Sequence, residues 1–113
     1  MELHTIRELP MPAPVAYQRA VAYLRNAGYR RKWWGNGFVR DQRQFTELEP
    51  SLDQWSVAVE VEVRPQQPET AVMAVIFRIN THGRTMTDPV RHLWEEELAK
   101  LVAAVVAAAP SSA

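Results

Sequence analysis

The sequence contains no cysteine, so the chain forms no disulfide bond, offers no thiolate to a metal ion and has no cysteine nucleophile. It also lacks a long apolar run: the longest, residues 101–109, falls short of the about 20 residues that a membrane-spanning helix needs. Residues 1–14 lack the apolar segment of a secretion signal. We therefore expect no membrane span and a cytoplasmic location, or a periplasmic one if an export signal has been removed.

What the chain does contain is typical of a single soluble, globular domain over residues 1–113. Its length and its hydrophobic content of 47% suffice for a hydrophobic core that needs no disulfide or other covalent cross-link. The net charge of zero conceals a division, because residues 1–43 carry eight basic and three acidic side chains, whereas residues 44–113 carry five and ten. Such asymmetry marks either a basic binding face or two halves that neutralise each other across the fold, and we favour the second interpretation.

The centre of the chain alternates between apolar and polar residues with a period of two. This pattern, rich in β-branched side chains, predicts half-buried strands over residues 55–64 and 71–80. The polar, proline-containing segment between them predicts an antiparallel hairpin. One face of this hairpin is expected to line the core: Trp55, Val57, Val59, Val61 and Val63 in the first strand, and Met73, Val75, Phe77 and Ile79 in the second.

Two other segments repeat their apolar residues with the helical period. The first helix is predicted over residues 14–27, opened by Pro14 and closed by Gly28. The second is predicted over residues 88–108, with Pro89 at its first position. The remaining segments are an extended arm over residues 1–12 that suits a sheet edge, one bent strand or a hairpin over 29–44, and a frayed tail over 109–113.

Residues 29–44 interleave basic and aromatic side chains around a Gly-Asn-Gly segment. The simplest interpretation, which we favour, is an amphipathic strand with aromatic residues in the core and basic residues in solvent. The alternatives are contact with a protein or small ligand, for which Trp and Arg supply much of the energy, and single-stranded nucleic acid, whose bases stack on rings. The residues singled out for ligand or anion contact are Arg30, Arg31, Lys32, Trp33, Trp34 and Arg40.

The second strand of the hairpin is apolar on both faces. Its even-numbered positions Val72, Ala74 and Ile76, together with Ala58 in the first strand, form a small apolar set opposite the core face. A strand that is apolar on both faces is usually covered on both faces. We therefore predict that this second face contacts another chain, the N-terminal arm or a ligand.

The sequence offers no catalytic constellation. His82 stands beside Arg84 and near Asp88, and these residue types can do acid–base chemistry, but no nucleophile or metal-spaced partner accompanies them. We therefore predict a protein that is not an enzyme and that uses neither a metal nor a cofactor.

The expected fold is a two-layer α+β sandwich, in which an antiparallel meander of three to four strands packs both helices on one face. A helix that ends in Ala27-Gly28-Tyr29, a strand with Gly37-Phe38-Val39-Arg40, two further strands and a final helix opened by Asp88-Pro89 form its framework. This pattern, over about residues 14–106, resembles small bacterial helix-grip-like domains, including domains of envelope lipoproteins. The resemblance implies a non-catalytic binding or assembly role, although this chain has no lipidated cysteine.

Three hypotheses for function follow. The first is a small interaction or assembly domain that forms a homo-oligomer, or binds a protein partner, through its sheet. The second is a small-ligand carrier with a groove between the sheet and the second helix, lined by Trp33, Trp34, Trp55 and Trp94. The third and least favoured is a nucleic-acid binder that uses the basic residues of 29–43.

Overall fold

The computed structural model describes the chain apart from residues 33–34, 36, 44–50, 82 and 108–113. It contains five strands, two α-helices and one short 3-10 helix. No helix among the described residues is long and apolar enough to cross a bilayer. In chain order the elements are β1 (Glu2–Leu9), α1 (Ala13–Asn26), β2 (Arg30–Arg31), β3 (Gly37–Arg40), η1 (Leu52–Gln54), β4 (Ser56–Gln67), β5 (Thr70–Asn80) and α2 (Asp88–Ala107).

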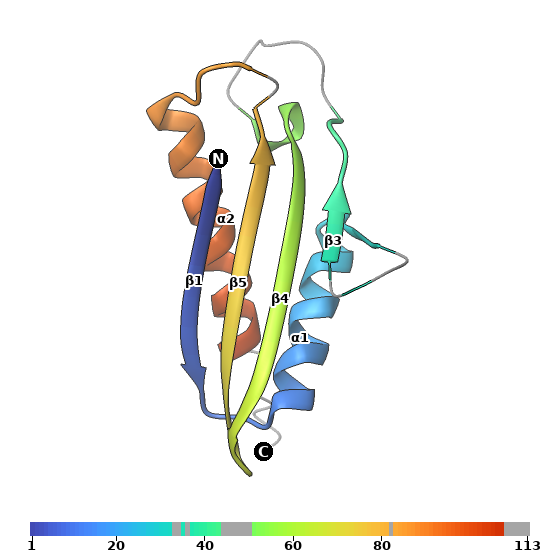
Figure 1. Cartoon of the computed structure of the whole chain (residues 1–113), viewed down its shortest axis with the longest axis vertical. Coiled ribbons are helices and arrows are strands. Elements are labelled where there is room, and N and C mark those ends of the chain that lie inside the picture. The colour runs from blue at the N-terminus through green and yellow to red at the C-terminus, as the bar shows by residue number, and fades with distance from the viewer. Residues whose placement is uncertain (33–34, 36, 44–50, 82, 108–113) are drawn as a thin grey trace.

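The five strands form one antiparallel sheet in the order β1-β5-β4-β3-β2 (Figure 1). Strands β2 to β5 follow one another as a meander, and β1 adds to its far edge by pairing with β5 along its whole length, from Glu2 to Leu9. The sheet therefore has one strand more than the three to four expected. The N-terminal arm is a full edge strand, and residues 29–44 supply the two short strands of a hairpin rather than one bent strand.

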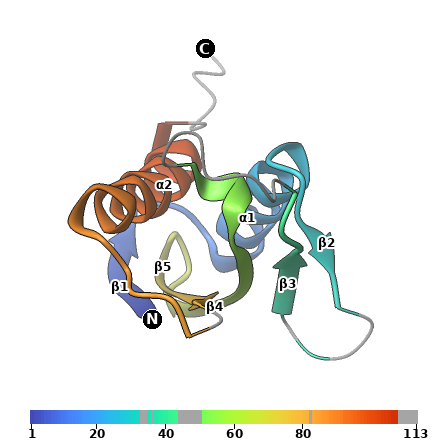
Figure 2. The ribbon, with the colours of Figure 1, turned by 90° about the horizontal axis from the view of Figure 1, so that it is seen from above.

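Both helices lie on the same face of the sheet, which confirms the predicted two-layer α+β architecture (Figure 2). Helix α1 packs on β4 and β5, α2 packs on β1 and brings Trp94 against Phe77 of β5, and the two helices also pack against each other. The core forms between these layers, with Trp94, Phe38, Phe77 and Leu24 among its most deeply buried side chains. At the far end of the helix pair, Arg19 donates a hydrogen bond to the carbonyl oxygen of Val105 at 3.2 Å.

The register of β4 on β5 explains which residues line the core. Val57 pairs with Ile79, Val59 with Phe77 and Val61 with Val75. Side chains of directly opposed residues point to the same face of a sheet, so the odd-numbered residues of both strands face the helices together. These residues are buried, whereas Val63, near the tip of the hairpin, is only partly buried. The predicted core face of the hairpin is thus confirmed.

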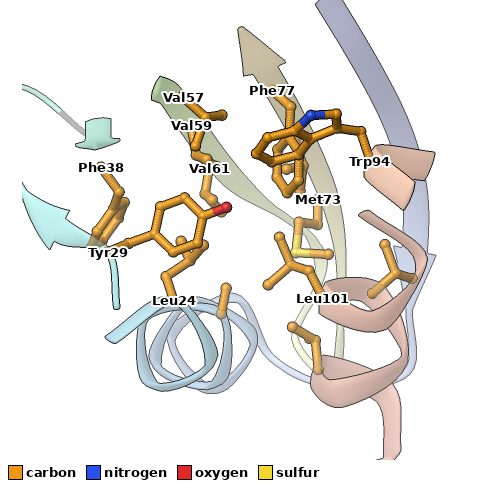
Figure 3. Packing of buried hydrophobic residues seen from close by; sticks show 14 of the residues in the cluster. Leu24, Tyr29, Phe38, Val57, Val59, Val61, Met73, Phe77, Trp94 and Leu101 are labelled. Carbon is orange, nitrogen blue, oxygen red and sulfur yellow. The ribbon is translucent and has the colours of Figure 1, made fainter. Parts of the chain in front are cut away.

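The end of α1 directs the chain into β2 by a glycine-based cap. Gly28 takes a φ of +91°, in the left-handed region that favours glycine. The amide of Gly28 donates to the carbonyl of Arg25 at 3.1 Å, and the amide of Tyr29 donates to that of Leu24 at 2.9 Å. This pair of hydrogen bonds is the Schellman arrangement, in which the residue after the glycine packs back on the helix. Tyr29 consequently enters the core beside Leu24 (Figure 3).

Candidate functional site

The face of the sheet opposite the helices is the first candidate site, and Figure 1 looks onto it. Because both α1 and α2 lie on the other side, neither helix covers the even-numbered side chains of β5. Three of the predicted interaction residues, Val72, Ala74 and Ile76, form a half-buried apolar stripe along β5. The structure therefore brings these three together on an open face.

The apolar neighbour of this stripe comes from β1 rather than from β4. Ile6 pairs with Ala74 and is 71% exposed, which makes it a large apolar side chain standing in solvent. Ala58, the fourth predicted residue, lies across from Arg78 on the same face and so stands beside the stripe rather than in it. Ile6 was not singled out from the sequence. The signal was its even number in an alternating segment, because Leu3 and Leu9 have odd numbers and point to the core, so Ile6 points to the other face.

Charged residues border the stripe at one end. The Arg78 guanidinium bridges Glu60 on β4, at 2.5 Å between Nη1 and Oε1, and Glu2 on β1, at 3.5 Å between Nε and Oε2. The hydrogen bond and charge of Glu60, with a smaller contribution from Glu2, hold the pKa of Arg78 above its ordinary value. All three side chains are substantially exposed, so they form a polar border to the stripe and not a buried network.

A shallow groove of about 420 Å³ opens on the same face between β3 and β5. Gly37 shapes it, because a Cβ atom at this position would lie 2.9 Å from Cδ of Lys32, whose side chain lies over the glycine. Residues of both charges and apolar residues share its lining, which includes Lys32, Glu60, Glu62, Ala74 and Ile76. The apolar stripe thus continues into a groove with a mixed-charge wall.

The basic residues of the 29–43 stretch do not gather into one surface. Arg30 pairs with Asp41 at 3.2 Å, Arg31 is exposed on β2, and Lys32 lines the groove on the open face. Arg40 points the other way, into the core, because it follows Phe38 by two residues on β3 and opposes Val57. Of the aromatic residues expected to act with them, Trp33 and Trp34 lie outside the described residues.

The two other tryptophans of the expected ligand groove are core residues. Trp94 is fully buried and meets the Phe77 ring edge-to-face, with centroids 6.1 Å apart. Trp55 is 4% exposed and lies under the Arg84 guanidinium at 4.1 Å from its ring centroid. Their indole Nε1 atoms have no hydrogen-bond partner within the described part of the chain.

The second candidate site surrounds Arg40 inside the molecule. Arg40 is 6% exposed, and its Nη1 donates to the carbonyl oxygen of Ala27 at 3.2 Å. Its guanidinium lies 4.8 Å from the centroid of the Tyr29 ring and 5.9 Å from that of Trp94, which are cation–π distances. One charged side chain from β3 is thus held between the start of β2 and the buried stripe of α2.

Two further polar side chains belong to this interior site. Glu97 on α2 is 8% exposed and accepts a hydrogen bond from the Tyr23 hydroxyl on α1 at 3.0 Å. Burial, and then the Glu97 charge, raises the pKa of Tyr23, and burial raises the pKa of Tyr29 to about 12 although Arg40 acts in the opposite direction. Both hydroxyls are therefore neutral donors at neutral pH.

Glu97 was not singled out from the sequence, but its position carries a signal. It follows Val90 by seven residues and precedes Leu101 by four, which places it on the buried stripe of α2. The charge of Glu97 and its neighbours at 95 and 96 masked that periodicity. Among the described residues no group of three or more His, Cys, Asp or Glu side chains is placed to hold a metal ion.

The fold defines the chain as a two-layer α+β protein with five antiparallel strands and two helices on one face. No protein-family model matches it, and no curated protein matches its sequence. Among solved structures it is similar to the crystal structure of an uncharacterized protein from Bacillus thuringiensis, at 9% sequence identity and a TM-score of 0.51. That match covers 96% of this chain and 98% of the other. At so low an identity it shows a shared fold and nothing about activity.

Proposed function

We propose that this chain is a small, non-enzymatic interaction domain of the helix-grip-like kind that self-associates through the open face of its sheet. One observation carries the proposal: the apolar stripe Val72, Ala74 and Ile76 runs along β5 on the face without helices, extended by Ile6. Apolar side chains gathered on an open face favour contact with another protein surface, because contact removes their area from water.

The charges around the stripe favour a second copy of the same chain as the partner. A twofold interface brings one surface patch against itself, so a patch of a single sign would repel its copy. This face instead carries both signs: Glu2, Glu8, Glu60 and Glu62 stand with Arg64, Arg78 and Lys32 on its strands and groove. Glutamates at the centre of the face also disfavour a polyanion such as nucleic acid.

The test is the solution mass of the purified chain by light scattering, with variants at two matched apolar positions. The wild type is expected to show twice its 12.9 kDa mass. Ile76→Arg places a charge in the stripe and should return the mass to that of a monomer with an unchanged circular dichroism spectrum. Val106→Arg is the matched control, since Val106 is 40% exposed on α2 and away from the open face, and it should stay a dimer.

Two results would overturn this proposal. A wild type that is monomeric at every concentration measured removes self-association as its function. A dimer that persists in Ile76→Arg places the interface somewhere other than the open face of the sheet.

A further inference from the structure

The outer edge of β1 is an open sheet edge that runs the full length of the strand. Strand β1 (Glu2–Leu9) pairs with β5 on one side, and no strand among the described residues pairs with its other side (Figure 1). The opposite edge of the sheet, β2, is two residues long. Proteins commonly protect a long edge strand with a proline or a β-bulge. Strand β1 has neither, because its register on β5 is unbroken and Pro10 follows its last residue.

The hydrogen bonds between β1 and β5 identify the backbone groups that point away from β5. The amino group of Met1 donates to the carbonyl oxygen of Ile79 at 3.0 Å, and the Ile79 amide donates to the Met1 carbonyl oxygen at 2.8 Å. Hydrogen-bonded and non-hydrogen-bonded pairs alternate along an antiparallel ladder, so the odd-numbered residues of β1 bond to β5. The amide and carbonyl groups that point outward therefore belong to the even-numbered residues Glu2, His4, Ile6 and Glu8.

The side chains of β1 are self-complementary in one antiparallel register. When Ile6 lies opposite Ile6 of a second copy, His4 lies opposite Glu8 on the open face. Two apolar side chains then face each other on the axis, and a histidine stands beside a carboxylate on either side of it. The opposed pairs on the inner face are Leu3 with Leu9 and Thr5 with Arg7.

The neighbouring registers of the same edge are less favourable. An axis at Thr5 opposes Glu2 and Glu8, which are two carboxylates, and an axis at Arg7 opposes two guanidinium groups. Like charges directly opposite each other destabilise a strand pair. An axis at Ile6 avoids both contacts, and it lets the outward amide and carbonyl of Ile6 exchange hydrogen bonds with those of its copy. The sequence of β1 thus favours one register with itself.

We propose that β1 pairs antiparallel with β1 of a second copy of the chain, with Ile6 on the twofold axis. The two five-stranded sheets join into one, and their open faces lie on the same side. This contact is at the edge of the sheet and is separate from the contact between open faces proposed above. It gains mainly backbone hydrogen bonds, which water also supplies to a free edge, so it is the weaker contact and forms at higher protein concentration.

Disulfide cross-linking tests this register, because the chain has no cysteine and a single introduced cysteine can form a disulfide only between two copies. Opposed residues of a hydrogen-bonded pair have Cα atoms about 5.5 Å apart, which a disulfide can span. Ile6→Cys should therefore cross-link under mild oxidation. His4→Cys is the matched control, exposed on the same strand and face. In this register its copy is four residues away, about 14 Å, and it should cross-link at least tenfold more slowly.

A mixture of two variants tests the same register at a second position. His4→Cys and Glu8→Cys are opposed in the proposed pair, so they should cross-link with each other at least tenfold faster than either does with itself. Preferential cross-linking of either variant with itself would overturn the register.

The Ile76→Arg background separates the edge from the open face. This substitution is expected to remove the contact between open faces and leaves the outer edge of β1 unchanged, so Ile6→Cys should still cross-link at least tenfold faster than His4→Cys. Equal rates at the two positions in this background would overturn the edge pairing. Selective cross-linking that requires the wild-type Ile76 would also overturn it, because Ile6 would then meet its copy across the open faces.

A backbone substitution tests the hydrogen bonds themselves. Adding His4→Pro to Ile6→Cys removes an outward amide and leaves the bonds of β1 to β5 in place, since proline is tolerated where its nitrogen faces away from the ladder. Cross-linking should be lost, whereas His4→Gln, which keeps the amide, should retain it. Unchanged cross-linking in a folded His4→Pro variant would contradict the proposal. If that variant does not fold, the mixture of His4→Cys and Glu8→Cys decides.

The two proposed contacts can fail separately. A chain that is a dimer by light scattering, but whose Ile6→Cys variant cross-links no faster than His4→Cys, retains the proposed function and rejects the edge pairing. A chain that is a monomer by light scattering, but whose Ile6→Cys variant cross-links selectively, does the reverse.

Discussion

Arg40 and Arg78 lie on opposite faces of the same sheet, and of these two arginines Arg78 alone has carboxylate partners among the described residues. Arg78 lies on the open face and bridges Glu2 and Glu60. Arg40 lies on the inner face, nearly fully buried, with one carbonyl and two aromatic rings as its contacts. Stability alone favours the reverse arrangement, since a buried charge needs its partner far more than an exposed one does. Among the described residues, the inner face thus gives its buried arginine fewer charged partners than the open face gives its exposed one.

The largest expected difference between the two faces is in the stability lost when neighbouring residues of β5 are truncated. Phe77 points inward and is fully buried, whereas Ile76 points outward and is half-buried. Phe77→Ala should lower the free energy of unfolding by about 3–5 kcal/mol, through lost burial and the cavity that remains. Ile76→Ala should lower the free energy of unfolding of the monomer by about 1 kcal/mol or less, because the Ile76 side chain remains partly exposed to water in the folded chain.

Urea denaturation of both variants measures this difference, at a protein concentration low enough to keep the chain monomeric. Equal losses for Phe77→Ala and Ile76→Ala would mean that the two faces of β5 are buried alike, and would contradict the open face.

The next effect is a dependence of stability on alkaline pH that comes from the inner face. Burial raises the pKa of Tyr29 from 10.0 to about 12. Its contribution is full below pH 10 and is lost as the pH rises from 10 toward 12, because over that range the unfolded chain ionises this hydroxyl while the folded one keeps its proton. The free energy of unfolding should fall by about 2–3 kcal/mol over this range, at 1.36 kcal/mol for each unit of pKa.

Denaturation at pH 9, 10, 11 and 12 tests this expectation, with Tyr29→Phe as the control. The variant has no ionisable group at this position, so its stability should fall less steeply, and the slope that remains includes the part due to Tyr23, whose pKa is also raised. Identical slopes for the wild type and Tyr29→Phe would show that the Tyr29 hydroxyl is not buried.

A third substitution, at Arg40 itself, is expected to raise the free energy of unfolding rather than to lower it. Arg40→Met keeps a side chain of similar length and removes a charge whose Nε and Nη2 atoms have no hydrogen-bond partner among the described residues. The change leaves the Ala27 carbonyl without its donor, but the relief of the unpaired buried charge should outweigh that loss. We expect the variant to be more stable by about 1–2 kcal/mol, which is the lower part of the gain found when a buried ion pair is replaced by well-packed apolar residues.

Chemical denaturation of the wild type and of Arg40→Met measures this gain. A large loss of stability would instead show that the guanidinium acts as a structural strut between β3 and the end of α1. A gain would mean that the chain tolerates a destabilising arginine at this position.

The same two faces show what a sequence can predict. The burial of Val57, Val59 and Val61 follows from alternation alone, because a period of two maps directly onto the faces of a strand. The pairing of β1 with β5 was harder to predict. Paired residues such as Leu9 and Ala71 are far apart in the sequence, and local patterns do not encode that contact. The hairpin of β2 and β3 was left open because its glycines permit either a turn or a bulge.

The interior site was missed for a different reason. Arg40 was grouped with Arg30, Arg31 and Lys32 by its charge, although its spacing of two from Phe38 places it on the inner face. Glu97 likewise lies at a core position of the helical period and was not singled out from the sequence. In both cases the residue type outweighed the periodicity, and a charged residue at a position where the pattern demands an apolar one is itself the signal of a site.

The smallest expected effect completes the comparison of the two arginines. Arg78→Met removes an exposed guanidinium whose carboxylate partners are also exposed, so water replaces the lost ion pairs at almost no cost. Its urea midpoint should match that of the wild type, whereas the midpoint of Arg40→Met should rise. Raising the salt concentration should leave the difference between these two variants unchanged, because salt screens exposed pairs and reaches a buried charge far less. A midpoint for Arg78→Met that falls sharply and recovers with salt would show that Glu2 and Glu60 repel each other across β5 and that Arg78 is needed to hold the open face together.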